Sequence, residues 1–289
     1  MKLISGIYND KQLNKYLDFI DGAILMVPHF SLVYEDLDLN KAISKMKKLG
    51  KTIILSLNKI FTEDEIDEAY KFLDEYKNEE VLFYVADLGL IKYAKDNNIL
   101  DKIIYNPETM ITNYLDLSVY MGFNLDAYGI SNEITIEDLK TIYDKTKAPL
   151  FYLGFGKRLM FYSKRKLLSL YKEKYQTKFS FDDLYLKEET RDDKYKIIEN
   201  NNGTMIYRSY FISLHKELDD LLFLKYFYID PLDLEEDDYL NALSAYHDYL
   251  YNIIGHDEFI KKIDSLNLNI SDGFAYNDSV YQKEDLKNG

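Results

Sequence analysis

The sequence contains no cysteine, and this absence excludes several kinds of chemistry. Without thiolates the chain cannot form disulfides, use a cysteine nucleophile, or hold an iron–sulfur cluster or a zinc ion through cysteine. Only four histidines are present, and no two of them form a metal-type pair such as His-Glu-x-x-His. We therefore predict no metal site and no iron–sulfur cofactor within this chain.

Long apolar runs are also missing. No segment approaches the roughly 18–20 consecutive apolar residues that a helix needs to cross a bilayer. The first residues, MKLISGIYND, lack the basic region, apolar core and small-residue cleavage site typical of a secretory signal. We therefore expect a cytoplasmic protein with no membrane partner.

Basic side chains are fewer than acidic ones, 36 against 50, which gives a net charge of −14. This charge argues against broad, nonspecific adhesion to nucleic acid or anionic membranes. The distribution is uneven, however, because residues 146–171 contain no Asp or Glu. Arginine occurs only four times, and all four residues lie between positions 158 and 208.

The guanidinium group is rigid, permanently charged and suited to carboxylate or phosphate. Clustered arginine beside an acid-free segment therefore predicts an anion- or RNA-binding surface. The predicted binding residues are Lys157, Arg158, Lys164, Arg165, Arg191 and Arg208. Salt bridges with surrounding acidic residues are the alternative interpretation, since such pairs are common on surfaces.

Short, nearly continuous apolar segments alternate with longer helical patterns along the chain. The predicted strands are 3–8, 22–27, 52–58, 81–86, 102–106, 127–131, 149–156 and 224–231. Helices that begin after Thr62 and Thr135 show capping-box patterns. This rhythm is typical of β/α units around a parallel sheet and predicts an eight-stranded β/α (TIM-type) barrel. A doubly wound open sheet is the alternative, but no Gly-rich phosphate loop follows the first strand.

Residues 157–223 interrupt the alternation after the seventh strand. The segment KYKIIENNNGTMIYRS predicts a β-hairpin, because two apolar runs flank an Asn-Gly turn. We expect the barrel to span residues 1–255, including this insertion, and a C-terminal extension to span 256–289. Segments that follow barrel strands lie at the C-terminal face, where active sites form.

No catalytic constellation is evident from residue spacing. The best candidates are polar residues directly after predicted strands, which point into the mouth of a barrel. Asn106 and Glu133 are the two weak catalytic candidates. Each also has a structural explanation, Asn106 as a turn residue before Pro107 and Glu133 as a first-turn helix acid.

Three segments carry a resemblance to a known family: NPETMITN, SKRKLLSLY and LKEETRDDKYKIIENNNGT. In order and spacing along nearly the whole chain, the sequence resembles the collagenase-like peptidases of family U-32, in particular their short Gram-positive-type members. The resemblance implies an N-terminal barrel and, from the family label, a peptidase (hydrolase). Some members of the family are tRNA hydroxylation factors, for which an iron–sulfur cluster held by cysteines and the ligand prephenate are implied.

The sequence departs from the family pattern at four positions. The resemblance implies histidine where Phe155 stands, and cysteines near Leu159, Lys166 and Ser213. Three hypotheses therefore stay open. The first is a tRNA-modification factor of the uridine 5-hydroxylation type, or a partner subunit of a longer cysteine-bearing paralogue, which binds RNA or a prephenate-like anion. The second is a collagenase-like peptidase, and the third is a non-catalytic barrel scaffold.

Overall fold

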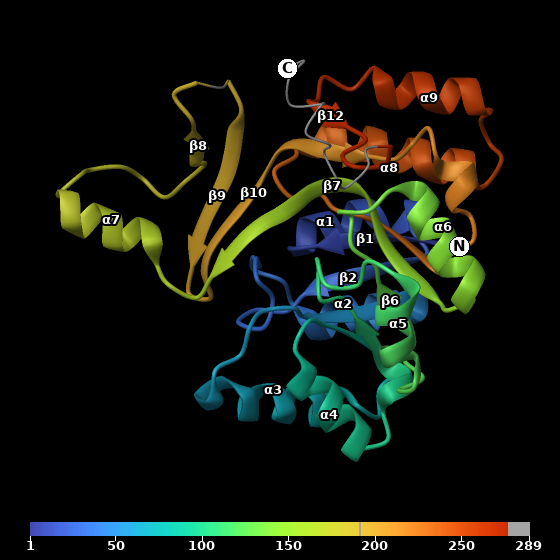
Figure 1. The fold of residues 1–289 in the computed structure, drawn as a ribbon, viewed down its shortest axis with the longest axis horizontal. Helices are drawn as coiled ribbons and strands as arrows, with labels where there is room; N and C mark the ends of the chain where they lie inside the picture. Colours follow the sequence, from blue (N-terminus) through green and yellow to red (C-terminus); the bar gives the residue numbers. More distant parts are fainter. Residues whose placement is uncertain (191, 277–289) are drawn as a thin grey trace.

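The computed structural model describes residues 1–190 and 192–276 and shows a closed barrel of eight parallel strands surrounded by helices (Figure 1). The barrel strands are β1 (Lys2–Ile7), β2 (Gly22–Met26), β3 (Thr52–Leu57), β4 (Leu82–Val85), β5 (Ile103–Tyr105), β6 (Ala127–Gly129), β7 (Leu150–Ser163) and β11 (Tyr226–Ile229). Strand β11 pairs with both β7 and β1, which closes the barrel. The predicted TIM-type architecture is confirmed, and the eight predicted strands correspond to these eight.

Helices follow the barrel strands as the alternation predicts. They are α1 (Asp10–Tyr16), α2 (Leu39–Lys48), α3 (Glu63–Tyr76), α4 (Leu88–Asp96), α5 (Tyr114–Met121), α6 (Ile136–Thr146) and α8 (Glu236–Leu250), with short 3₁₀ turns at Leu17–Phe19, Leu100–Lys102 and Leu218–Leu221. Capping boxes start α3 at Thr62 and α6 at Thr135. These reciprocal bonds satisfy backbone N–H groups that a helix start leaves without partners.

Two apolar layers hold the barrel together. Alternate strand residues point to opposite faces, so Ile4, Ile54 and Ile104 pack inside the barrel with Phe151. Neighbouring positions such as Leu3 face outward into the larger core between strands and helices. The near-continuous apolar character of the strands follows from burial on both faces.

The insertion begins inside β7, whose first half belongs to the barrel and whose second half leaves it. That second half pairs antiparallel with β10 (Gly203–Ser213), which pairs with β9 (Lys194–Asn200) and thus forms the predicted hairpin. Helix α7 (Leu167–Tyr175) and the short strand β8 (Tyr185–Lys187) complete an arm that projects to one side of the barrel (Figure 1). Gly156 marks the departure point, since its φ is +136° and an added Cβ would lie 2.9 Å from the Asp230 Cβ.

The C-terminal segment packs on the barrel near the end of β10. Helix α9 (His256–Asp264) lies against α8, and the Phe259 ring stacks on the Tyr249 ring with centroids 4.6 Å apart. Strand β12 (Ile270–Ser271) pairs with β10. Within residues 1–190 and 192–276, no helix is both long and apolar enough to cross a membrane.

Candidate site at the barrel mouth

A small cavity of about 70 Å³ lies at the C-terminal ends of the barrel strands. Its floor and walls come from residues at or just after those ends, including Tyr8, Asn58, Tyr84, Asn106, Ile130 and Asp230. Its roof comes from the insertion, through Lys157 and Leu159 of β7 and Tyr207 of β10. The cavity therefore forms where barrel enzymes place their sites, and the arm narrows it.

Asn106, one of the two catalytic candidates, lies in this cavity. Its Nδ2 donates a hydrogen bond to the Tyr84 hydroxyl, and its Oδ1 accepts one from the Glu108 backbone N–H at 3.1 Å. The side chain fits only because β6 has glycine at position 129, where a Cβ would lie 2.3 Å from Asn106 Oδ1. The amide is thus held in one orientation at the cavity wall.

Two carboxyl groups that the sequence reasoning did not single out, Glu108 and Asp230, also line the cavity. Burial raises the pKa of Glu108 to about 7, Arg158 opposes the rise, and Asp230 adds to it. Burial raises the pKa of Asp230 to about 6, although hydrogen bonds from Leu232 N–H, Tyr8 and Tyr228 favour its ionised form. Both groups therefore exchange protons close to neutral pH, as general acids and bases in enzymes do.

Tyrosines dominate the rest of the wall. Tyr8, Tyr84, Tyr207 and Tyr228 all line the cavity, and burial raises the pKa of each phenol well above its ordinary value. The Tyr8 hydroxyl donates to Asp230 Oδ1 at 2.9 Å. These rings supply flat apolar surface and neutral hydroxyls, a combination suited to binding a small polar ring.

Three of the predicted anion-binding residues are engaged by acidic residues beside the mouth. Lys157 is buried, with its Nζ 3.2 Å from Asp233 and 4.6 Å from the Phe211 ring centroid. Arg158 forms an ion pair with Glu133, the second catalytic candidate. Arg208 approaches the same carboxylate at 3.6 Å.

Glu133 therefore has two guanidinium partners. Burial and the charge of Arg208 lower the pKa of Arg158 to about 10, so its guanidinium keeps its charge near neutral pH. Glu133 thus contacts both guanidinium groups and holds them beside the mouth.

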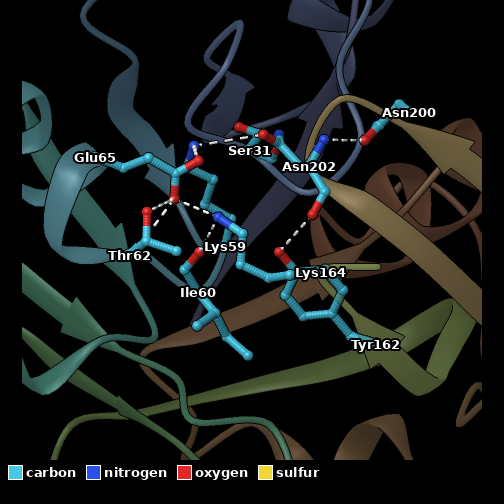
Figure 2. A network of polar contacts seen from close by, with 9 residues as sticks. All are labelled: Ser31, Lys59, Ile60, Thr62, Glu65, Tyr162, Lys164, Asn200 and Asn202. Atoms are coloured by element: carbon cyan, nitrogen blue, oxygen red, sulfur yellow. Dashed lines mark hydrogen bonds and ion pairs between the residues drawn. The ribbon is translucent and has the colours of Figure 1, made fainter. Parts of the chain in front are cut away.

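Lys164 lies in a polar network that fastens the hairpin turn to the barrel (Figure 2). Its Nζ forms an ion pair with Glu65 at the start of α3, and Lys59 approaches the other oxygen of that carboxylate at 3.1 Å. From the hairpin turn, Asn202 donates its side-chain N–H to the Ser31 carbonyl at 2.7 Å. The network connects the loops after β2 and β3 to the arm.

The remaining predicted cations lie elsewhere. Arg165 is exposed, and Arg191 lies outside the described residues. The arginines whose side chains the structure describes thus do not converge on one pocket. Of the predicted cations, Lys157 lines the mouth cavity, Arg158 and Arg208 lie beside it, and Lys164 and Arg165 belong to the arm.

The positions at which the family resemblance implies histidine or cysteine are also dispersed. Phe155 is fully buried and packs against Tyr246, with ring centroids 5.9 Å apart, so it points into the outer core. Leu159 lines the cavity, Lys166 is exposed on the arm, and Ser213 ends β10 opposite Phe155. Their side chains do not fit an iron–sulfur cluster. In the part of the chain that the structure describes, no group of three or more His, Asp or Glu could hold a metal ion.

A hydrogen-bonded series of serine, histidine and aspartate was not identified from the sequence. The Ser213 hydroxyl lies 2.8 Å from His215 Nδ1, and His215 Nε2 lies 3.0 Å from Asp264 Oδ1. In serine hydrolases the nucleophile is accessible and the aspartate is buried. Here Ser213 is only 4% exposed and the Asp264 side chain is 45% exposed, the reverse of that arrangement, and the series joins β10 to α9.

The missed cavity residues follow a rule that the sequence reasoning applied elsewhere. Asp230 directly follows β11, and Glu108 comes two residues after Asn106. The cavity tyrosines could not be singled out from the sequence, because the chain contains 28 tyrosines. Asp87, another polar residue after a strand, is the N-cap of α4 and accepts from Gly89 N–H at 2.6 Å.

Comparison with known proteins agrees with this architecture. Peptidase family U32 matches residues 31–284. The curated tRNA hydroxylation protein P2 of Bacillus subtilis (strain 168) is 25% identical over 268 residues, which cover 84% of this chain and 85% of that protein. The solved structure of the U32 peptidase Mk0906 superposes with a TM-score of 0.52 and 11% identity over 80% of this chain and 92% of that one, a likeness of fold alone. With its barrel, its insertion after the seventh strand and a family match over most of its length, the chain belongs to peptidase family U32.

Proposed function

We propose that this chain is a tRNA-modification factor of the uridine 5-hydroxylation type. The observation that carries the proposal is the mouth cavity, where the Asn106 amide and the carboxyl groups of Glu108 and Asp230 converge among tyrosine rings. Enzymes that modify a base take it out of the stack, read its edge with hydrogen bonds and hold its faces against aromatic or apolar side chains. The similarity to tRNA hydroxylation protein P2 along most of the chain supports the same reading.

The family resemblance implies that hydroxylation uses an iron–sulfur cluster held by cysteines. This chain has no cysteine and therefore cannot hold such a cluster in that way. We propose that a longer cysteine-bearing paralogue supplies this chemistry as a partner subunit. In this arrangement the present chain binds and orients RNA or an anionic ligand. Without cysteine, this chain contributes binding and orientation, and the partner subunit carries out the hydroxylation.

Arg158 and Arg208 are the best candidates for holding that anion. The two guanidinium groups share one ion-pair partner, Glu133, and the charge of Glu108 also acts on Arg158. Arg208 Nε is buried without a hydrogen-bond partner among the described residues, and the Phe274 ring centroid lies 5.5 Å from its guanidinium carbon. A carboxylate of a prephenate-like ligand, or an RNA phosphate, fits this charge and this free donor.

Titration calorimetry with prephenate tests the anion site. Arg208→Ala should weaken binding at least about tenfold, the loss expected for one charge-assisted bond of roughly 1.5–3 kcal/mol. Lys147→Ala removes a charge from an exposed side chain at the end of α6 and should leave the affinity unchanged. Equal affinity of the wild type and Arg208→Ala would contradict the assignment.

Mass spectrometry of tRNA nucleosides from a deletion strain tests the function as a whole. In a strain that has the cysteine-bearing paralogue, we expect 5-hydroxyuridine-type nucleosides to decrease on deletion and to return on complementation with the wild-type chain. In a strain that lacks the paralogue, deletion of this chain should cause no further decrease. Complementation with Asn106→Ala, which removes the amide from the cavity, should restore less of the modified nucleoside than complementation with the wild-type chain. An unchanged nucleoside profile after deletion would rule the proposed function out.

A peptidase is the second candidate, because the cavity holds two carboxyl groups with pKa values near neutrality that could serve as an acid and a base. Cleavage of gelatin or a peptide library by the wild type, lost in Glu108→Gln, would favour it. No cleavage combined with an unchanged nucleoside profile would leave the non-catalytic scaffold as the best description.

A further inference from the structure

Helix α7 stands outside the barrel on the projecting arm (Figure 1). The structure describes all nine of its residues, and none of them is buried. Isolated helices of this length are marginal in water because forming the first turn is costly. Its stability therefore depends on specific contacts with the rest of the arm.

The hairpin provides those contacts at the start of α7. The Glu199 carboxylate of β9 accepts hydrogen bonds from the backbone N–H groups of Leu168 at 2.7 Å and Ser169 at 3.1 Å. Thr204 Oγ1 of β10 accepts from the Leu167 N–H at 2.9 Å. A carboxylate at this end of a helix also interacts favourably with the helix dipole. Strands β9 and β10 thus hold α7 in a fixed orientation.

The outer surface of this fixed helix is unusually apolar. Tyr171 and Tyr175, one turn apart, are 52% and 56% exposed, and their ring centroids lie 4.7 Å from each other. Leu170, the residue before Tyr171 in the same helix, is 52% exposed. Scattered exposed apolar residues are ordinary, but a contiguous group on a helix that buries nothing marks an interaction surface.

The same segment is basic although the protein as a whole is acidic. Residues 164–178 contain six basic side chains and one acidic one, Glu173, although the whole chain has a net charge of −14. Lys164 is paired with Glu65. The basic side chains of this segment that have no carboxylate partner within residues 1–190 and 192–276 are Arg165, Lys166, Lys172, Lys174 and Lys178.

We infer that the outer face of α7 docks a single-stranded segment of RNA. Bases stack on Tyr171 and Tyr175, and phosphates contact Lys174 and Lys178. Aromatic platforms flanked by basic side chains are how proteins bind single strands without reading their sequence. An acidic protein segment would satisfy the lysines but would not use the flat rings. The inference rests on the proposed function in taking RNA as the partner, and it places docking on the arm, away from the mouth.

Fluorescence anisotropy of the full chain with a labelled oligouridine of about 12 nucleotides, within the usual site size of single-strand binders, tests the inference. Tyr171→Ala/Tyr175→Ala should weaken binding about tenfold or more, because each lost stacking contact is worth roughly 1–3 kcal/mol. Lys174→Ala/Lys178→Ala should reduce the slope of log affinity against log salt by ~1.4, at ~0.7 for each lost contact to single-strand phosphate.

Matched controls separate these effects from misfolding. Tyr171→Phe/Tyr175→Phe keeps both rings and should bind as the wild type does. Tyr251→Ala removes a ring that is 54% exposed at the end of α8 and should not change the affinity. Circular dichroism and thermal melting of each variant verify that the fold is retained.

Several results would overturn the inference. One is equal oligouridine affinity of the wild type and the tyrosine double alanine variant. Another is tighter binding of duplex RNA of the same length, since a duplex hides its base faces. A third is loss of self-association or of paralogue binding in the double variant with RNA affinity unchanged, which would assign the surface to a protein partner.

The inference and the proposed function fail in different ways. If deletion leaves the tRNA nucleosides unchanged while the α7 variants still lose RNA affinity, the docking surface stands and the proposed function fails. If deletion removes the modified nucleoside while the α7 variants bind and complement normally, the function stands and the docking surface fails.

Discussion

Replacement of Glu108 by Gln should stabilise the protein at alkaline pH and leave its stability nearly unchanged at acidic pH. Burial raises the pKa of Glu108 from 4.5 to about 7 in the folded chain. A carboxyl group whose folded pKa is raised contributes most to stability below its unfolded pKa, and the contribution is lost as pH rises through the folded pKa. The wild type should therefore lose stability between about pH 4.5 and pH 7 relative to the neutral amide.

The size of the effect follows from the two pKa values. They differ by about 2.5, which at ~1.36 kcal/mol for each pKa unit gives an upper figure of ~3.4 kcal/mol. Because Glu108 is only partly buried, water screens some of this, and we expect about 2 kcal/mol. For a chain of this length that is a rise in Tm of roughly 4 °C.

Differential scanning calorimetry of both proteins at pH 5 and pH 8 measures the effect. The difference in Tm between Glu108→Gln and the wild type should be positive at pH 8. At pH 5, which lies just above the unfolded pKa of 4.5, it should be about a quarter of that value. Glu137→Gln, an exposed acid in the first turn of α6, serves as the control and should give no such growth with pH. A Tm difference that is equal at both pH values, or that falls as pH rises, would refute the assignment of Glu108 as a carboxyl group with a raised pKa.

Three further predictions concern the arm and its attachment. Burial raises the pKa of Glu65, but hydrogen bonds from Lys164, Thr62 and Lys59 outweigh burial and hold the pKa at about 2. Glu65→Gln should therefore lower the free energy of unfolding by about 1 kcal/mol at pH 7 and by progressively less below pH 4, as measured by urea titration. Ser213→Ala should destabilise the chain by about 1 kcal/mol in the same assay and leave any gelatin cleavage intact, and loss of cleavage would show that the serine is a nucleophile. Gly156→Ala should destabilise by roughly 2 kcal/mol, because of its positive φ and the nearby Asp230 Cβ; an unchanged urea midpoint would show that the bend tolerates a side chain.

The barrel could be predicted from the sequence because its signals are local. The capping boxes at Thr62 and Thr135, the short apolar strands and the Asn-Gly turn each report the conformation of a few neighbouring residues.

Only some of the residues at the barrel mouth could be predicted by the same logic. Asn106 was found because it follows a strand, and Asp230 obeys the same rule but lies within the segment assigned as the eighth strand.

The roles of the basic residues could not be predicted, because their partners are distant in sequence. Lys164 pairs with Glu65, 99 residues away, and Arg158 pairs with Glu133 across 25 residues. Periodicity and composition carry no information about which loops meet at the barrel mouth. Charge counting therefore did not separate cations that hold the arm in place from cations that face solvent.

The absence of acid from residues 146–171 is explained by this division of the cations. A local Asp or Glu would compete for Lys157, Arg158 and Lys164, whose carboxylate partners come from other elements and thereby fix the position of the arm. Because an ion pair formed across elements constrains the chain more than one formed within a strand, an acid-free segment favours the single arrangement in which the arm covers the mouth. Lys172 and Lys174 of α7 follow this stretch, on either side of Glu173, and have no carboxylate partner within residues 1–190 and 192–276. The acid-free segment thus secures the roof of the cavity, and the basic residues that follow it keep an exposed face positive.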